Sequence, residues 1–287
     1  MAGVKLDGLM VAGLVKDRVK SAVSHLKNDG IEPCLATVLV GDDSASATYV
    51  HNKHIACSKV GITTRDHRMP STTTKDELED LIDELNADST VHGILVQIPL
   101  PKSIDEFMII SRISPLKDVD GLTPYNVGLL AYGKSTFVPC TPMGIMEIFD
   151  HYKIPISRMN AVVINRSALV GKPIQNLLLA KDATVALCHS KTKDLPSYTQ
   201  EADIIVTAVG DRDKFELKPE MIKDGAVVID VATNRHNGVL SGDCDFDKMI
   251  QRASFVTPVP GGVGPMTIAM LLKNTVTAAS LRHSVED

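Results

Sequence analysis

The sequence predicts an α/β protein with two domains, each built around a mainly parallel sheet. Short apolar runs bounded by turn residues alternate with stretches of helical periodicity. The apolar runs lack the polar alternation of a half-exposed sheet, which is typical of strands buried on both faces. The alternation occurs in two separate series, and 287 residues are enough for two ordinary domains.

The first series contains two buried strands, at residues 34–40 and 93–98. A helix is expected between them over residues 44–60, with Gly61 where a left-handed residue ends a helix. A second helix is expected to begin after Thr74, which is followed three residues later by a glutamate, the sequence of a capping box. These elements predict a strand–helix–helix–strand order in the first domain.

The second series predicts the other domain, over residues 139–265, with a cleft between the two domains. A helix at residues 141–153 should join the domains. The last helix, at 265–282, should pack back on the first domain, which then comprises residues 1–138 and 266–287. The strands of the second series are expected at residues 161–164, 183–188, 202–209 and 226–231.

Composition excludes several classes of partner. A net charge of −5 predicts no binding to nucleic acid. The sequence has no run of about 18 apolar residues, so no membrane span is expected. Five scattered cysteines without a CxxC pair are typical of reduced thiols, so we expect a cytoplasmic protein. His51 and His54 are three residues apart, but no further ligands accompany them, so no metal is expected.

A strand followed by a tight turn and a helix indicates a nucleotide site at residues 161–173. Asn165 stands where a first glycine would be, and asparagine tolerates a left-handed turn. Arg166 and Ser167 follow, and Ser167 is placed to donate a hydrogen bond to a phosphate. Gly171 lies one residue beyond a standard third glycine. A structural turn without a ligand is an equally good interpretation of this motif alone.

The end of the following strand favours NADP over NAD. An NAD site places an acid there for the ribose 2′-hydroxyl, whereas this chain has Ser190, Lys191 and Thr192 and no acid before Asp194. Hydroxyl groups and a cation suit a 2′-phosphate. The alternative is a solvated loop. Together with the strand–turn–helix motif, this strand end predicts that the second domain is Rossmann-like.

A reaction centre is predicted around Lys53 in the first domain. Tyr49 and Lys53 lie four residues apart and would share one helix face. Gln97 is a polar residue at the end of a buried strand, where open α/β sheets place ligands. Asp120 lies in a turn, and residues 258–265 form a proline- and glycine-rich loop. A lone lysine is usually a surface charge, and such a loop can be a plain linker.

At these residues the sequence resembles the bifunctional methylenetetrahydrofolate dehydrogenase/methenyltetrahydrofolate cyclohydrolase family. Five blocks occur in the family's order and span nearly the whole chain. The blocks are residues 46–53, 93–101, 117–121, 166–173 and 257–267.

The resemblance implies two reactions on a tetrahydrofolate derivative. Hydride passes from 5,10-methylenetetrahydrofolate to NADP, and water then opens the methenyl product to 10-formyltetrahydrofolate in the same cleft. The resemblance also implies a homodimer formed through the nucleotide-binding domains and a place in purine biosynthesis.

Residue roles follow from the same resemblance. Lys53 would be the central cyclohydrolase group, and Gln97 would hydrogen-bond it and help to keep it partly neutral. Tyr49 would lie against the folate, and Asp120 would anchor the pterin through its N–H donors. Four polar residues, Tyr49, Lys53, Gln97 and Asp120, would thus form the catalytic set. The folate site would also be lined by Pro260, Gly261 and Gly262.

Three residues depart from the family pattern: Asn165 replaces a glycine, and Ala232 and Thr233 replace a glycine–isoleucine pair near the nicotinamide. Thr233 is nevertheless expected to contact the cofactor. Two other hypotheses stay open: another two-domain dehydrogenase, such as a shikimate-type enzyme, and a non-catalytic folate- or nucleotide-binding protein.

Overall fold

The computed structural model describes residues 2–236 and 239–286 of the chain. The chain forms two compact units. Unit 1 contains the N-terminal residues through Gly13, residues 130–134 and residues 139–267. Unit 2 contains residues 14–129, residues 135–138 and the chain from Ile268 onward. The predicted fold class, two α/β domains with mainly parallel sheets, is confirmed.

Unit 1 is built on a six-stranded sheet in the order β1-β11-β8-β7-β5-β6, and every neighbouring pair is parallel. Its inner strands are short and apolar, and their side chains are almost all buried, as expected for strands covered on both faces. The strands are β1 (Val4–Lys5), β5 (Asn160–Ile164), β6 (Thr184–Cys188), β7 (Ile204–Thr207), β8 (Val227–Asp230) and β11 (Phe255–Val256).

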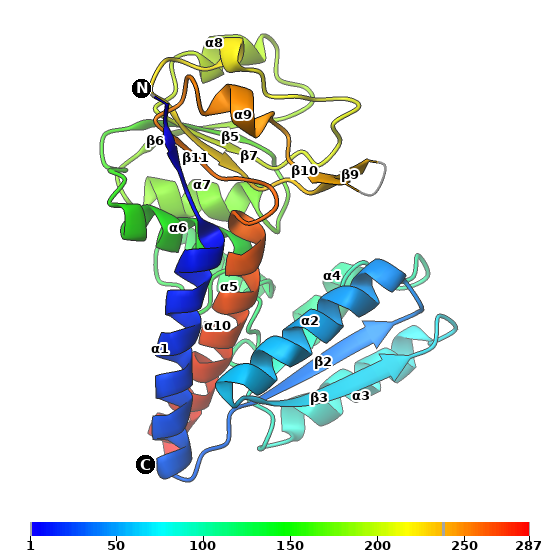
Figure 1. The fold of residues 1–287 in the computed structure, drawn as a ribbon. Coiled ribbons are helices and arrows are strands. Elements are labelled where there is room, and N and C mark those ends of the chain that lie inside the picture. Colours follow the sequence, from blue (N-terminus) through cyan, green and yellow to red (C-terminus); the bar gives the residue numbers. More distant parts are fainter. Residues whose placement is uncertain (1, 237–238, 287) are drawn as a thin grey trace. The chain divides into compact units, whose positions relative to one another are not determined.

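Helices cover both faces of this sheet. Figure 1 shows α6 (Cys140–Tyr152) and α7 (Gly171–Leu179) on one face, with α8 (Leu195–Thr199) and α9 (Phe246–Met249) on the other. A buried cluster lies between the sheet and the second group and includes Val162, Ile205, Val228 and Met249. A 3₁₀ turn at Pro219–Met221 and an antiparallel hairpin complete the unit. The hairpin strands are β9 (Asn234–His236) and β10 (Val239–Ser241).

Unit 2 is built on a parallel three-stranded sheet in the order β3-β2-β4. The strands are β2 (Cys34–Val40), β3 (Thr63–Met69) and β4 (Gly93–Val96). β2 and β4 are fully buried, whereas β3 is a polar edge strand with exposed side chains. The sheet is accompanied by α2 (Ser44–Val60), α3 (Lys75–Ala87), α4 (Glu106–Arg112) and α5 (Pro124–Ala131).

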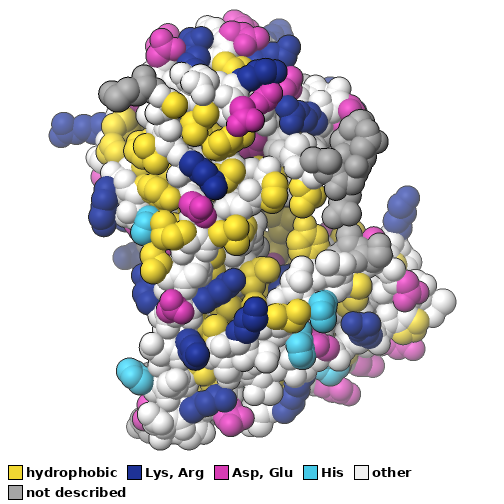
Figure 2. Space-filling model, viewed as in Figure 1, with side chains coloured by type: hydrophobic (Ala, Val, Ile, Leu, Met, Phe, Trp, Pro, Cys, Tyr) yellow, Lys and Arg dark blue, Asp and Glu magenta, His cyan; other side chains and the backbone are white. Residues whose placement is uncertain are grey.

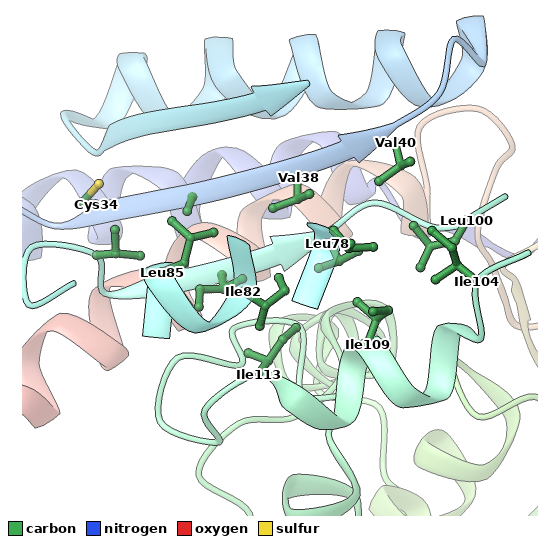
Figure 3. Close-up of a cluster of buried hydrophobic side chains, with 14 residues drawn as sticks. Cys34, Val38, Val40, Leu78, Ile82, Leu85, Leu100, Ile104, Ile109 and Ile113 are labelled. Carbon is green, nitrogen blue, oxygen red and sulfur yellow. The ribbon is translucent and has the colours of Figure 1, made fainter. Parts of the chain in front are cut away.

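The core of unit 2 lies between the sheet and the helices α3 and α4 (Figure 3). Leu78, Ile82 and Leu85 recur at helical spacing on α3 and point to the sheet, where they pack with Val38 of β2. Ile109 from α4 closes the same cluster. This packing fixes the carboxyl ends of β2 and β4, and Gln97 directly follows β4.

Two long helices have residues in both units. α1 (Gly8–Asn28) begins in unit 1, and α10 (Val263–Glu286) begins directly after the proline- and glycine-rich loop. The structure confirms the expected helices at 44–60, 141–153 and 265–282 to within a few residues. The capping box at Thr74 and the left-handed Gly61, with φ of 85°, are also confirmed.

The surface carries both signs of charge. On the face shown in Figure 2, Lys and Arg side chains are interspersed with Asp and Glu, and hydrophobic side chains lie between them. Among the described residues, no helix is long and apolar enough to span a bilayer. Within residues 2–236 and 239–286, no three His, Cys, Asp or Glu side chains form a group that could hold a metal ion.

Candidate active site

Helix α2 positions the predicted lysine. The Asp43 side chain accepts from the Ser46 backbone N–H at 2.7 Å and caps the start of the helix, and Gly61 ends it. Tyr49 and Lys53 are one turn apart on this helix, with Tyr49 51% exposed and Lys53 half-buried. The helix therefore presents an aromatic ring and an amine on the same face.

Lys53 contacts Gln97 directly. Its Nζ donates to Gln97 Oε1 at 3.0 Å. Gln97 follows β4, and its backbone N–H donates to Val38 O of β2 at 2.8 Å. The Gln97 side chain is itself oriented, because its Nε2 donates to Ile98 O at 2.7 Å. The amide oxygen is thus directed at the lysine, and this contact joins α2 to the residue that follows β4.

The turn after α4 brings Asp120 to the same end of the sheet. Ile94 of β4 forms a parallel bridge with Asp118, so the turn runs alongside the strand and Asp120 comes level with its end. Asp118 is 1% exposed and accepts from the backbone N–H groups of Leu122 and Thr123. Asp118 therefore stabilises the turn, while Asp120 is only half-buried.

Lys117, the other charged residue of this motif, has a structural role. It is 6% exposed, and its Nζ donates to the carbonyl groups of Leu85, Asn86 and Asp88 at 2.7–2.8 Å. These carbonyls lie at the carboxyl end of α3, where a helix leaves acceptors without intrahelical donors. The buried ammonium satisfies them and holds the Asp120 turn against α3.

The loop before α10 lies in unit 1. Pro260 is exposed, Gly261 has a φ of 100° that favours glycine, and Gly262 is buried. A Cβ added to Gly262 would lie 2.5 Å from Pro258 O. The loop is therefore folded tightly on itself, and a side chain at Gly262 would force it open.

A cavity of about 580 Å³ lies at the carboxyl ends of β5, β6 and β7 in unit 1, the position at which open parallel sheets bind ligands. Four predicted cofactor residues line it: Asn165, Arg166, Ser190 and Thr192. Lys191 lies in the same turn and is exposed. The remaining lining residues were not predicted from the sequence; they are Ile164, His189, Leu195, Val209, Asp211, Lys214 and Phe215.

Asn165 does not adopt the left-handed conformation expected for it, since its φ is not positive. Its side chain instead bridges the turn: Oδ1 accepts from Ser167 N at 2.6 Å, and Nδ2 donates to Ala208 O at 2.6 Å. This is an Asx turn, which asparagine can form without a left-handed backbone. Asn165 therefore ties the end of β5 to the end of β7.

Ser167 and Gly171 build the start of α7. Ser167 Oγ accepts from the N–H groups of Val170 and Gly171 at 3.1 and 3.4 Å, so it stabilises the turn that leads into α7, and its hydroxyl proton remains available to a ligand. A Cβ on Gly171 would lie 2.2 Å from Asn165 O. Gly171 is thus required for the close approach of helix and turn, the role of a third glycine in dinucleotide folds.

A second cavity, of about 560 Å³, adjoins the β9–β10 hairpin and is lined by Thr233, Asn234 and Ser241 together with residues 210–213. Thr233 is exposed to it, whereas Ala232 is 5% exposed and points away from solvent. Of the two family departures here, Thr233 alone presents its side chain to the cavity.

Two buried acids hold the walls of both cavities, and sequence reasoning missed them. Asp243 is fully buried and accepts from Thr207 Oγ1, Val209 N and Gly210 N at 2.6–3.0 Å. Asp230 is 1% exposed and accepts from the backbone N–H groups of Asp243 and of the following residue. Burial raises the pKa of Asp230 to about 6. Asp230 lies in the apolar strand predicted at 226–231, a signal for its burial, whereas no sequence signal separates Asp243 from surface acids.

The fold and the two cavities define the class: a two-domain α/β enzyme with one domain suited to a nucleotide cofactor. Family models agree. One described as the tetrahydrofolate dehydrogenase/cyclohydrolase catalytic domain matches residues 6–120, and the NAD(P)-binding domain of that family matches residues 139–283. The chain belongs to the tetrahydrofolate dehydrogenase/cyclohydrolase family, as its resemblance predicted.

Individual relatives support this assignment. The chain is 62% identical over 285 residues to the bifunctional protein FolD of Nitrosopumilus maritimus, with 99% of each chain covered. The crystal structure of FolD from Campylobacter jejuni superposes with a TM-score of 0.95 at 46% identity, over 98% of this chain and all of the other. FolD from Trypanosoma brucei, solved with NADP and an inhibitor, gives 0.93 at 36% identity over the whole of both chains.

Proposed function

We propose that this protein oxidises 5,10-methylenetetrahydrofolate to 5,10-methenyltetrahydrofolate with NADP and then hydrolyses that product to 10-formyltetrahydrofolate. The observation that carries the proposal is the Lys53–Gln97 contact at the end of a buried parallel sheet. It occurs in a chain whose family contains both activities. We assign folate chemistry to residues 1–138 and 266–287 and cofactor binding to residues 139–265. Residues 2–13 of the first range pack in unit 1, which carries the cofactor cavity.

The 580 Å³ cavity fits NADP. It combines the cation Arg166 with the hydroxyl groups of Ser190 and Thr192, and these suit a 2′-phosphate. Asp211 also lines it but is paired with Lys214 at 2.5 Å, so the ribose would not meet a free acid there. When bound, NADP would accept the hydride from the one-carbon bridge of the substrate.

Further cofactor contacts are assigned from the geometry of the turn and the hairpin. Asn165, Ser167 and Gly171 would shape the phosphate-binding turn, and the Ser167 hydroxyl would donate to a phosphate oxygen. Lys191 would add positive charge beside the 2′-phosphate. Thr233 would face the nicotinamide half from the adjoining cavity.

Lys53 would act in the hydrolytic step. Water adds to the bridging carbon of the methenyl cation, and the bond from that carbon to N5 breaks. One of the two water protons ends on N5, and the other is released. A lysine accepts such a proton near neutral pH only in its neutral form, which a nearby substrate cation favours. Gln97 would hold the amine in position, because its oriented Oε1 accepts from Nζ.

The remaining residues would bind folate. Tyr49 would pack on the substrate ring from the same helix face as Lys53. Asp120 would accept from the adjacent N–H groups of the pterin, a pairing that two carboxylate oxygens match. The Pro260, Gly261 and Gly262 backbone would provide a further wall of the folate site.

The test is a pair of spectroscopic assays on the purified protein. Methylenetetrahydrofolate with NADP should produce methenyl absorbance, and added methenyltetrahydrofolate should lose its absorbance faster than in buffer. The same assay with NAD in place of NADP should be slower. Absence of turnover in both assays would contradict the proposed function.

We also infer that two copies associate through the nucleotide-binding domain and that the protein is cytoplasmic. β6 is an edge strand with half-buried side chains, and Leu179 at the end of the adjacent α7 is 58% exposed. All five cysteines are free and buried, which suits a reducing compartment. Light scattering of wild type and Leu179→Glu tests the dimer, since the variant should be monomeric.

A further inference from the structure

The N-terminal strand is laid along the segment that leads into the Pro260–Gly262 loop. β1 pairs in parallel with β11, with Val4 opposite Phe255 and Lys5 opposite Val256. The backbone N–H of Val4 donates to Ser254 O at 2.7 Å, and that of Leu6 donates to Val256 O at 2.8 Å. The loop begins immediately after this pairing, so the N-terminal residues run beside it.

The start of α1 then touches the loop itself. Leu9 N donates to Gly261 O at 3.1 Å. A Cβ added to Gly8 would lie 1.8 Å from Gly262 O and 2.5 Å from Gly262 C, far inside contact distance. No positive φ explains Gly8, since it is the first residue of a helix. Glycine is therefore required at this position because the backbones of Gly8 and Gly262 are in direct contact.

The loop has little freedom to yield. Gly262 is pressed on its other side, where a Cβ would approach Pro258 O at 2.5 Å and Thr257 Cβ at 2.9 Å. Leu6, which precedes the contact, is fully buried, and Asp7 N donates to Tyr152 Oη of α6 at 2.8 Å. The N-terminal segment is thus anchored on the sheet and on a helix before it reaches Gly262.

From these contacts we propose that Gly8 is a positioning residue, which sets the place of the Pro260–Gly262 backbone without contacting the substrate. The inference rests on the proposed folate contact of this loop. A methyl group at Gly8 would displace Gly262, and the displaced backbone would bind folate less well. The cofactor cavity at β5–β7 is lined by other residues and should be unaffected.

Helix α1 provides a matched control. Gly13 lies in the same helix, is exposed, and a Cβ there meets nothing within 4 Å. Gly8→Ala and Gly13→Ala both add one methyl group to α1, and both replace glycine by a better helix former. A difference between the two variants therefore reports the contact with Gly262.

The experiment compares both full-length variants with wild type by steady-state kinetics and by amide hydrogen exchange of residues 257–262. We expect Gly8→Ala to raise the KM for methylenetetrahydrofolate at least about tenfold, since small misplacements of positioning groups are costly. The KM for NADP should stay within about twofold of wild type, because a change at a distant, independent site has at most an effect of this size. Exchange in the loop should accelerate, and Gly13→Ala should match wild type in every measurement.

Two results would overturn the proposal. Gly8→Ala with a wild-type folate KM and unchanged loop exchange would show that the contact positions nothing. An equal rise in the KM for both substrates would indicate general destabilisation. A third outcome separates the two proposals. If the wild type has no folate activity but Gly8→Ala still shows faster loop exchange, the positioning role is supported and the proposed function is rejected.

If Gly8→Ala does not fold, Val4→Pro takes its place. Proline removes the N–H that donates to Ser254 O and places its ring Cδ toward that oxygen, so it loosens the pairing of β1 with β11 without touching Gly262. It should raise the folate KM in the same direction by a smaller factor. An unchanged folate KM in folded Val4→Pro would also contradict the proposal.

Discussion

The lysine site in unit 2 and the nucleotide cavity in unit 1 are built in different ways. Lys53 and Gln97 meet through one hydrogen bond between a regular helix and the residue that follows a regular strand. The cavity walls are turns instead, and a buried acid holds them, because Asp243 accepts from the backbone N–H groups of Val209 and Gly210. Helical spacing and a polar residue at a strand end therefore predict the first kind of site. They do not predict which acid supports the second.

The largest expected effect tests whether the lysine site acts on its own. Lys53→Met keeps the length of the side chain and removes the amine, so the cyclohydrolase rate should fall at least about a hundredfold. NADP binding should survive, because Lys53 does not line the cofactor cavity. The assay is the loss of methenyl absorbance, with cofactor affinity measured by calorimetry.

Lys59→Met is the control for this change, since Lys59 is exposed near the end of the same helix. It should leave both activities intact. A Lys53→Met protein that hydrolyses methenyltetrahydrofolate at the wild-type rate would remove Lys53 from the centre of the reaction.

The second effect tests the nucleotide cavity alone. Ser190→Asp places a carboxylate where the 2′-phosphate is proposed to bind. The ratio of kcat/KM with NADP to that with NAD should fall at least about tenfold, because a like-charge contact costs several kcal/mol. Cyclohydrolase activity should stay unchanged.

Ser197→Asp, on exposed α8 outside the cavity lining, adds the same charge nearby. It should leave the cofactor ratio at its wild-type value. The placement of the 2′-phosphate at Ser190 is refuted by an unchanged ratio in Ser190→Asp.

The strands that sequence patterns predicted are those whose side chains are mainly apolar and buried. Strands β2 and β5 matched their apolar runs, because burial on both faces leaves a continuous signal. The edge strand β3 was missed, since its side chains are polar and exposed. β1 was missed as well, because a two-residue edge strand carries no periodicity.

The same division applies to the candidate site. Tyr49 and Lys53 follow from helical spacing, and Gln97 follows from its place at a strand end. Asn165 was assigned a left-handed turn that it does not adopt, because its side chain makes a tertiary hydrogen bond to Ala208 O. Asp243 was not identified, since its partners are backbone N–H groups that only the fold brings near.

A third prediction concerns unit 1 alone: the buried Asp230 should make the free energy of unfolding depend on pH. Its pKa is raised by burial from 3.8 to about 6, so the folded state holds the proton more tightly than the unfolded chain. The resulting stability is fully present below pH 3.8 and is lost as the pH rises to about 6. Within this window the free energy of unfolding should fall by about 1.4 kcal/mol per pH unit.

Urea unfolding of wild type and Asp230→Asn between pH 4.5 and 6.5, spanning roughly the window in which this linkage acts, measures the effect. The stability advantage of wild type over the variant should shrink as the pH rises. Carboxylates with lowered pKa values, such as Asp203 and Asp83, lose their contributions at lower pH and do not mimic it. An advantage that is constant over this range would show that Asp230 keeps an ordinary pKa.

The smallest effect concerns the support of the lysine site. Thr74 caps α3: its Oγ1 accepts from Glu77 N at 3.3 Å, and Glu77 Oε2 accepts from Thr74 N at 2.8 Å. Thr74→Ala should lower the free energy of unfolding by about 1 kcal/mol and Tm by a few degrees. The exposed Thr72→Ala is the control and should not change Tm. Because α3 supports β4 through its apolar face and through the buried Lys117, the cyclohydrolase rate at about 25 °C should be unchanged. A rate that falls with the loss of this cap would mean that the lysine site, like the nucleotide cavity, depends on a hydrogen bond at the end of a supporting element.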